Sequence, residues 1–259
     1  MNDCQRLHYN TYGETSNPPL IVLHGLLGES SNWRTAARFL QQDYYVIALD
    51  LRNHGKSPHY KGMSYLEMSN DVLAIMQHLQ LETVSIMGHS MGGKVAMYLA
   101  LHNAKRIQQL IVVDIAPVTY PLLHQSIFKT LLTLPISEIK NRQEADRHLS
   151  IDIDDPFERS FLLKNLARTD DGFQWQCNLT EISRNYLKIA DFPKTTERYD
   201  KRCLFVQGGR SNYINTDNIP LIHPYFPQAE IQKIPKAGHL PHVQTPQSFL
   251  QTVIDYITD

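Results

Sequence analysis

The stretch Gly88-His89-Ser90-Met91-Gly92 decides the fold of this chain. Residues 83–87 before it are apolar and β-prone, and residues 94–102 after it are rich in helix formers. A serine between a strand and a helix sits on a sharp, strained turn with its hydroxyl exposed, and flanking glycines remove side chains that would clash there. The free N–H groups of the following helix attract negative charge. A chance Gly-rich turn is the alternative, but the strand-then-helix context favours a nucleophile at Ser90.

Short apolar runs predict the core strands, at residues 20–23, 44–49, 84–87, 110–113 and 203–206. Unbroken runs of this length are typical of strands that are covered on both faces. Helical patterns are expected around them, at residues 33–40, 64–79, 91–102 and 247–257. Residues 5–12 are expected to add an edge strand or hairpin. The alternation of strands and helices predicts an α/β fold with a mostly parallel sheet flanked by helices.

One region lacks this alternation. Between residues 118 and 193 no core strand is predicted, and helical patterns appear instead, at residues 122–132, 138–149, 156–166 and 179–189. We therefore expect a helical cap at residues 118–193, inserted into a core made of residues 1–117 and 194–259.

Composition excludes several other classes of protein. A length of 259 residues suits one domain with an insertion, and a formal charge of −1 gives no reason to bind nucleic acid or an acidic membrane. No apolar stretch approaches the ~20 residues of a membrane span. Cys4, Cys177 and Cys203 are too sparse for a disulfide framework and fit a reducing compartment. Residues 1–10 do not resemble a secretory signal, so a cytoplasmic protein is expected.

A serine nucleophile needs a base and an acid. Functional groups in an α/β sheet gather at the carboxyl ends of its strands. His239 follows Gly238 near the end of the chain, and the order of serine first and histidine last is that of a known hydrolase arrangement. His242, which lacks a preceding glycine, is expected to be a loop histidine bonded to the backbone.

The acid is less obvious. Its usual position, at the end of a G-x-x-D string after the next-to-last strand, is occupied here by Ser211. Asp114 ends the strand beside the nucleophile strand and is the preferred acid, although a strand-end cap would also explain it. Asp217 is the other candidate, but N-capping of a helix accounts for it well.

Two further loops follow strand ends. Residues 24–28 are expected to supply an oxyanion hole through the N–H of Leu26, together with that of Met91. Residues 50–57 form a polar turn in which Asp50 and Arg52 are expected to pair. Arg52, Asn53 and His54 remain candidates for facing the pocket.

Taken jointly, these motifs resemble the α/β-hydrolase superfamily. Residues 50–58, 88–94, 113–118, 208–213 and 237–239 look like the corresponding strings of the YbfF group of bacterial esterases. The resemblance implies an esterase with a small helical cap and no cofactor. No metal is expected either, because the sequence contains no cluster of metal ligands. It also implies that the triad acid lies in the D-I-x-P string, at Asp114, and that Ser211 sits near the triad. Arg210 departs from the group, which often has asparagine there.

The sequence thus predicts a carboxylic-ester hydrolase in which Ser90 forms an acyl-enzyme. Its expected partner is a small acyl ester, or an acyl thioester, and it is expected to be a monomer or small homo-oligomer. An apolar acyl pocket is expected from the loop after the first core strand and from the cap, lined by Leu27, Leu122, Leu123, Ile127 and Phe128. One alternative is C–C bond hydrolysis or a synthase-type elimination on a carbonyl acid, held by Arg52 or Lys94. Another is a ligand receptor with slow turnover.

Overall fold

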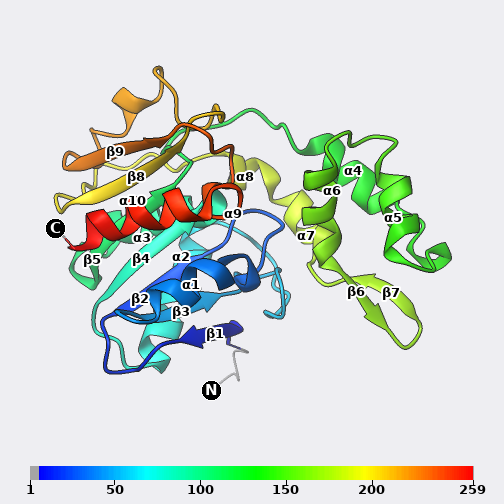
Figure 1. Cartoon of the computed structure of the whole chain (residues 1–259), viewed down its shortest axis with the longest axis horizontal. Helices are drawn as coiled ribbons and strands as arrows, with labels where there is room; N and C mark the ends of the chain where they lie inside the picture. The colour runs from blue at the N-terminus through cyan, green and yellow to red at the C-terminus, as the bar shows by residue number, and fades with distance from the viewer. Residues whose placement is uncertain (1–5, 259) are drawn as a thin grey trace.

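The computed structural model describes residues 6–258, and its centre is a seven-stranded sheet (Figure 1). The spatial order of the strands is β1-β3-β2-β4-β5-β8-β9; β1 runs antiparallel to β3 and the other pairs are parallel. The strands are β1 (Tyr9–Tyr12), β2 (Pro19–Leu23), β3 (Tyr45–Leu49), β4 (Val84–His89), β5 (Ile107–Val113), β8 (Cys203–Gly208) and β9 (Ala229–Ile234). The predicted mostly parallel α/β fold is therefore confirmed.

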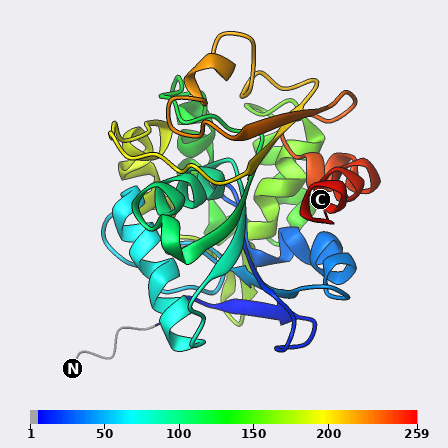
Figure 2. The ribbon, with the colours of Figure 1, turned by 90° about the vertical axis from the view of Figure 1, so that its left-hand side faces the viewer.

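Both faces of the sheet are covered, which explains the unbroken apolar runs. Successive strand residues point to opposite faces, so Ile21 and Leu23 join one buried cluster while Leu20 and Val22 join the other. Figure 2 shows α2 (Tyr65–His78) and α3 (Met91–His102) on one side of the sheet, and α1 (Arg34–Leu40) and α10 (Pro246–Thr258) on the other. The edge strand β9 was not among the predicted core strands, because its burial is only partial.

The chain leaves this core after β5 and returns before β8, and most of the intervening residues stand to one side of the sheet (Figure 1). They form α4 (Gln125–Thr133), α5 (Arg142–Leu149), α6 (Pro156–Leu162), α7 (Leu179–Arg184) and α8 (Tyr186–Ala190). We call residues 118–193 the cap. A further short helix, α9 (Pro241–Gln244), lies in the core just after the expected catalytic histidine.

The cap also holds a β-hairpin that was not predicted. The helix expected over residues 156–166 ends at Leu162, and β6 (Leu166–Thr169) then pairs with β7 (Gly172–Trp175). Leu166 is fully buried and lies opposite Trp175. Asp170 and Asp171 lie between the two strands, and Gly172, the first residue of β7, has φ +130°. Aspartate and glycine are typical turn residues, so this element was readable in principle.

Within residues 6–258 no helix is long and apolar enough to cross a bilayer. Cys177 and Cys203 are buried free thiols, and burial raises the pKa of both to about 12. Cys4 lies outside the described residues.

Candidate active site

Ser90 occupies a strained turn between β4 and α3. Its backbone has φ +51° and ψ −117°, a region that residues other than glycine rarely adopt. A Cβ on Gly88 would lie 2.2 Å from the carbonyl oxygen of Gly92, and a Cβ on Gly92 would lie 2.5 Å from that of His24. The two glycines of the motif are therefore required by close backbone contacts, and the turn lifts the Ser90 hydroxyl out of the sheet.

Three side chains that are distant in the sequence meet at this turn. His239 Nε2 lies 3.1 Å from Ser90 Oγ, and His239 Nδ1 lies 2.8 Å from Asp114 Oδ2. The other carboxylate oxygen of Asp114 accepts a hydrogen bond of 2.8 Å from the Gly208 amide. Asp114 is 0% exposed and has φ +51°. A carboxylate fixed in this way keeps the proton on Nδ1 and leaves Nε2 free to accept the serine proton.

Asp217 is far less suited to this role. It is exposed, and its backbone amide donates to Asn215 Oδ1 at 2.9 Å. The N-cap of the short 3-10 helix that follows is Asn218, so the N-capping expected of Asp217 is wrong.

Ser211 braces a loop near the triad. Its hydroxyl accepts from the Tyr213 amide at 3.2 Å, and its own amide donates to the carbonyl of Gly208, whose amide in turn holds Asp114. Ser211 thus stabilises the backbone of the loop whose Gly208 amide binds Asp114.

Two neighbours of His239 were missed by the sequence analysis. The Tyr213 ring stacks on the imidazole, with centroids 3.8 Å apart and an interplanar angle of 20°. On the core side, His89 Nε2–H donates to the carbonyl of His239 at 2.6 Å. Burial lowers the pKa of His89 well below its usual value, and the nearby His239 and His242 add to this effect. His89 was readable as part of the serine motif, whereas nothing local in the sequence marks Tyr213.

His242 is not the backbone-bonded loop histidine that was expected. Its ring is buried in α9 and stacks on Trp33 at 4.3 Å. Its Nδ1 has no hydrogen-bond partner among the described residues. Burial lowers its pKa to about 3, with His239 and Lys164 adding to the shift, so the ring serves as a neutral packing group.

The loop after β2 lies against the nucleophile turn. A Cβ on Gly25 would lie 3.2 Å from Ser90 Cβ. Leu27 has φ +56°, and its amide donates to His54 Nε2 at 3.1 Å. His24 braces the loop, since its Nδ1–H donates to the Gly25 carbonyl. Leu26 and Met91, the expected oxyanion donors, line the same cavity as Ser90.

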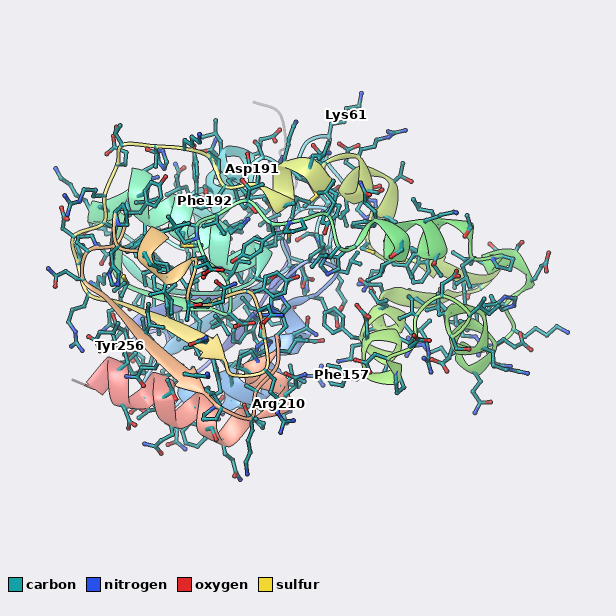
Figure 3. All side chains as sticks on the ribbon, turned by 90° about the horizontal axis from the view of Figure 1, so that it is seen from above. Lys61, Phe157, Asp191, Phe192, Arg210 and Tyr256 are labelled. Atoms are coloured by element: carbon teal, nitrogen blue, oxygen red, sulfur yellow. The ribbon has the colours of Figure 1, made fainter. Side chains whose placement is uncertain are left out.

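That cavity has a volume of about 380 Å³ and lies between core and cap. Most of its lining is apolar and comprises Leu26, Leu27, Met91, Ile115, Ile127, Phe157, Phe161, Leu162 and Ile189. Figure 3 shows Phe157 at the edge of the cap that faces the core. The cavity is thus shaped for a hydrocarbon group beside Ser90.

Two of the expected pocket residues, Leu27 and Ile127, line this cavity, but the other three do not. Leu122 and Phe128 line a separate groove of the cap, and Leu123 is 64% exposed. The prediction is wrong for Leu122 and Leu123 because they precede α4, which begins at Gln125. It is wrong for Phe128 because its side chain projects about 100° around the helix from that of Ile127, which faces the cavity.

The polar part of the cavity lining includes one lysine and two carboxylates. Lys94 Nζ donates to three backbone carbonyls, and burial lowers its pKa to about 7 against the opposing effect of Asp191. Asp155 and Glu158 lie on the cap side. Burial raises the pKa of the Glu158 carboxyl, with Asp155 adding to the shift. The cavity thus offers a substrate carboxylate no free cation among the residues that line it.

The polar turn after β3 lies apart from the cavity. The Arg52 guanidinium pairs with Asp71, at 2.6 Å and 2.8 Å, and not with Asp50 as expected. Asp50 instead accepts from the Ser30 and Lys56 amides and from His8 Nδ1. Arg52, Asn53 and His54 are buried outside the cavity lining. In the described part of the chain, no cluster of three His, Cys, Asp or Glu side chains could hold a metal ion.

Comparisons with known proteins agree with this architecture. The family model described as "alpha/beta hydrolase fold" matches residues 18–146. The chain is 38% identical to the "sn-1-specific diacylglycerol lipase ABHD11" of Xenopus laevis, over 97% of this chain and 83% of that one. It is 33% identical to "Esterase YbfF" of Escherichia coli (strain K12), over 94% of both.

A solved structure titled "Marine microorganism esterase" superimposes with a TM-score of 0.94 and 39% identity, covering 97% of this chain and 99% of that one. The chain therefore belongs to the α/β-hydrolase family and is related to esterases of the YbfF kind.

Proposed function

We propose that this protein hydrolyses carboxylic esters through a Ser90–His239–Asp114 triad and an acyl-enzyme. The observation that carries the proposal is the unbroken hydrogen-bonded line from Ser90 Oγ through His239 to Asp114, at the wall of an apolar cavity. Ser90 attacks the acyl carbonyl while His239 takes its proton and then passes it to the leaving alcohol. Water releases the acid in the second half-reaction. The amides of Leu26 and Met91 hold the oxyanion.

The cavity favours a neutral substrate. Its lining is largely hydrocarbon, and the carboxylates of Asp155 and Glu158 repel an anionic leaving group. Neutral esters are therefore the first candidates, and neutral acyl thioesters share the same chemistry. Acyl-coenzyme A, whose leaving group carries phosphates, is expected to be a poorer substrate. The relatives' names, esterase and diacylglycerol lipase, point to the same substrate class.

The decisive experiment is a panel of p-nitrophenyl esters, neutral thioesters and acyl-coenzyme A of graded chain length, assayed with the wild type and Ser90→Ala. Loss of the nucleophile should lower kcat/KM by about 10³-fold or more. Near-normal turnover by Ser90→Ala would refute the assignment. A single burst followed by silence in the wild type would instead indicate a receptor with slow turnover.

C–C bond hydrolysis or synthase chemistry on a carbonyl acid is less well supported. Such a substrate needs a cation for its carboxylate, yet Arg52 pairs with Asp71 and the three donors of Lys94 are occupied. We place the enzyme in the cytoplasm because its cysteines are few and because Cys177 and Cys203 are buried free thiols.

A further inference from the structure

Lys94 is a charged residue in an unusual place. It lies in the first turns of α3, where its backbone amide donates to the Ser90 carbonyl at 3.0 Å, and its side chain is only 2% exposed overall. Lysine is almost never so deeply buried unless its charge is compensated. The catalytic scheme above uses no amine, so this group needs another explanation.

The partners of Lys94 are the two ends of the cap. Its Nζ donates to the carbonyl of Val118 at 2.8 Å, where the chain enters the cap. It also donates to the carbonyls of Ala190 and Asp191, at 2.8 Å and 2.9 Å, where the chain returns to the core. Figure 3 shows Asp191 at this junction. We call the segments where the chain enters and leaves the cap, residues 116–122 and 187–193, the hinges. An ammonium has three N–H donors, and here each donor binds one carbonyl oxygen of the hinges.

The hinges also bind each other and reach the catalytic histidine. The Tyr120 amide donates to the Ala190 carbonyl at 2.9 Å, and the Tyr120 ring lies 4.8 Å from Lys94 Nζ. The Tyr120 hydroxyl donates to the carbonyl of Tyr213, whose ring stacks on His239. A shift of the first hinge would therefore disturb the packing of the imidazole as well as the cavity.

We propose that Lys94 is a positioning residue that fastens both ends of the cap to the nucleophile helix and thereby sets the shape of the acyl cavity. The charge matters because a neutral amine has only two N–H groups, so one hinge carbonyl would face a lone pair. Asp191 and Tyr120 are the charged and titratable groups that face Nζ. Burial lowers the pKa of Lys94 to about 7, which places the change from three donors to two near neutral pH.

The test uses Lys94→Met, which keeps the length of the side chain and removes all three donors, with Lys105→Met as a matched control on an exposed lysine. Hydrogen exchange at pH 6.5 should be faster in residues 116–122 and 187–193 of Lys94→Met and unchanged in the β6–β7 hairpin. Faster exchange throughout the chain, or unchanged exchange at the hinges, would overturn the proposal. This readout requires no catalysis, so it stands apart from the proposed function.

The kinetic arm rests on the proposed ester hydrolysis. At pH 6.5, Lys94→Met should raise KM for an octanoyl ester by about tenfold, because the hinges lose charge-assisted hydrogen bonds, while KM for an acetyl ester should change much less. The ratio of variant to wild-type KM should be smaller at pH 8.5, where the neutral amine of the wild type keeps only two of its three N–H donors. An equal rise for both esters, or a ratio that stays the same at pH 8.5, would overturn the proposal. If Lys94→Met does not fold, Lys94→Gln, which keeps two donors, is measured in its place.

Discussion

Asp114→Asn tests the least usual feature of the triad. In the wild type, the two carboxylate oxygens accept from His239 Nδ1–H and from the Gly208 amide. Asparagine has only one acceptor oxygen. If it faced His239, the NH₂ group would meet the Gly208 N–H, and a buried donor left unsatisfied costs about 1–3 kcal/mol. The oxygen should therefore face Gly208 and the NH₂ group should face the histidine.

That orientation places the imidazole proton of His239 on the wrong nitrogen. A donor opposite Nδ1 forces the proton to Nε2, which can then no longer accept from Ser90, and the developing imidazolium also loses its counter-charge. By analogy with the serine-protease triad, the cost is about 10⁴ in kcat, or roughly 5.5 kcal/mol at 1.36 kcal/mol per decade.

The assay is initial-rate hydrolysis of a p-nitrophenyl ester by Asp114→Asn, with Asp217→Asn as the matched control on an exposed aspartate. Thermal melting of both variants verifies that they are folded. If Asp114→Asn keeps more than a tenth of the wild-type rate, or if Asp217→Asn is instead the variant that loses activity, the assignment of the acid is wrong.

Three other predictions follow from the structure. Tyr213→Leu should lower kcat by up to about tenfold with little change in KM, since a stacked pair contributes about 0.5–1.5 kcal/mol to holding His239; an unchanged kcat would contradict this. Burial lowers the pKa of His54 and His242 to about 3 and that of His124 to about 4. Below about pH 6 the unfolded chain therefore binds protons that the folded chain does not. The free energy of unfolding should fall by roughly 1.4 kcal/mol per pH unit for each histidine. Equal free energies of unfolding in urea at pH 7 and pH 5 would refute this. Ester hydrolysis should survive EDTA, and its loss would reveal a metal requirement.

The sequence predicted the elements whose packing is dictated locally. Strand ends such as Ser90 and Asp114 were readable because buried parallel strands are continuous apolar runs that stop where polar residues begin. The position of His239 followed from chain order and a preceding glycine.

The contacts that were missed depend on distant segments. The stacking of Tyr213 on His239 joins a loop after β8 to one after β9. The pairing of Arg52 with Asp71 reaches from the loop after β3 to α2. In the cap, where helices are short, the residues that face the cavity depend on where each helix begins and how it packs against the core. Leu122 precedes α4, and Phe128 projects about 100° around the helix from Ile127, so both line a separate groove of the cap.

The proposed acid and the insertion follow the same strand, because Asp114 comes directly after β5 and only four residues before the cap begins at Val118. In a design that exchanges caps between relatives, the graft boundary would therefore fall beside the proposed triad acid. A chimaera joined at residue 114 would inherit a foreign backbone at the carboxylate that orients the base. One joined beyond Val118, with the segment back to Asp191 retained at the other end, would leave the chemistry intact while the substrate range was changed.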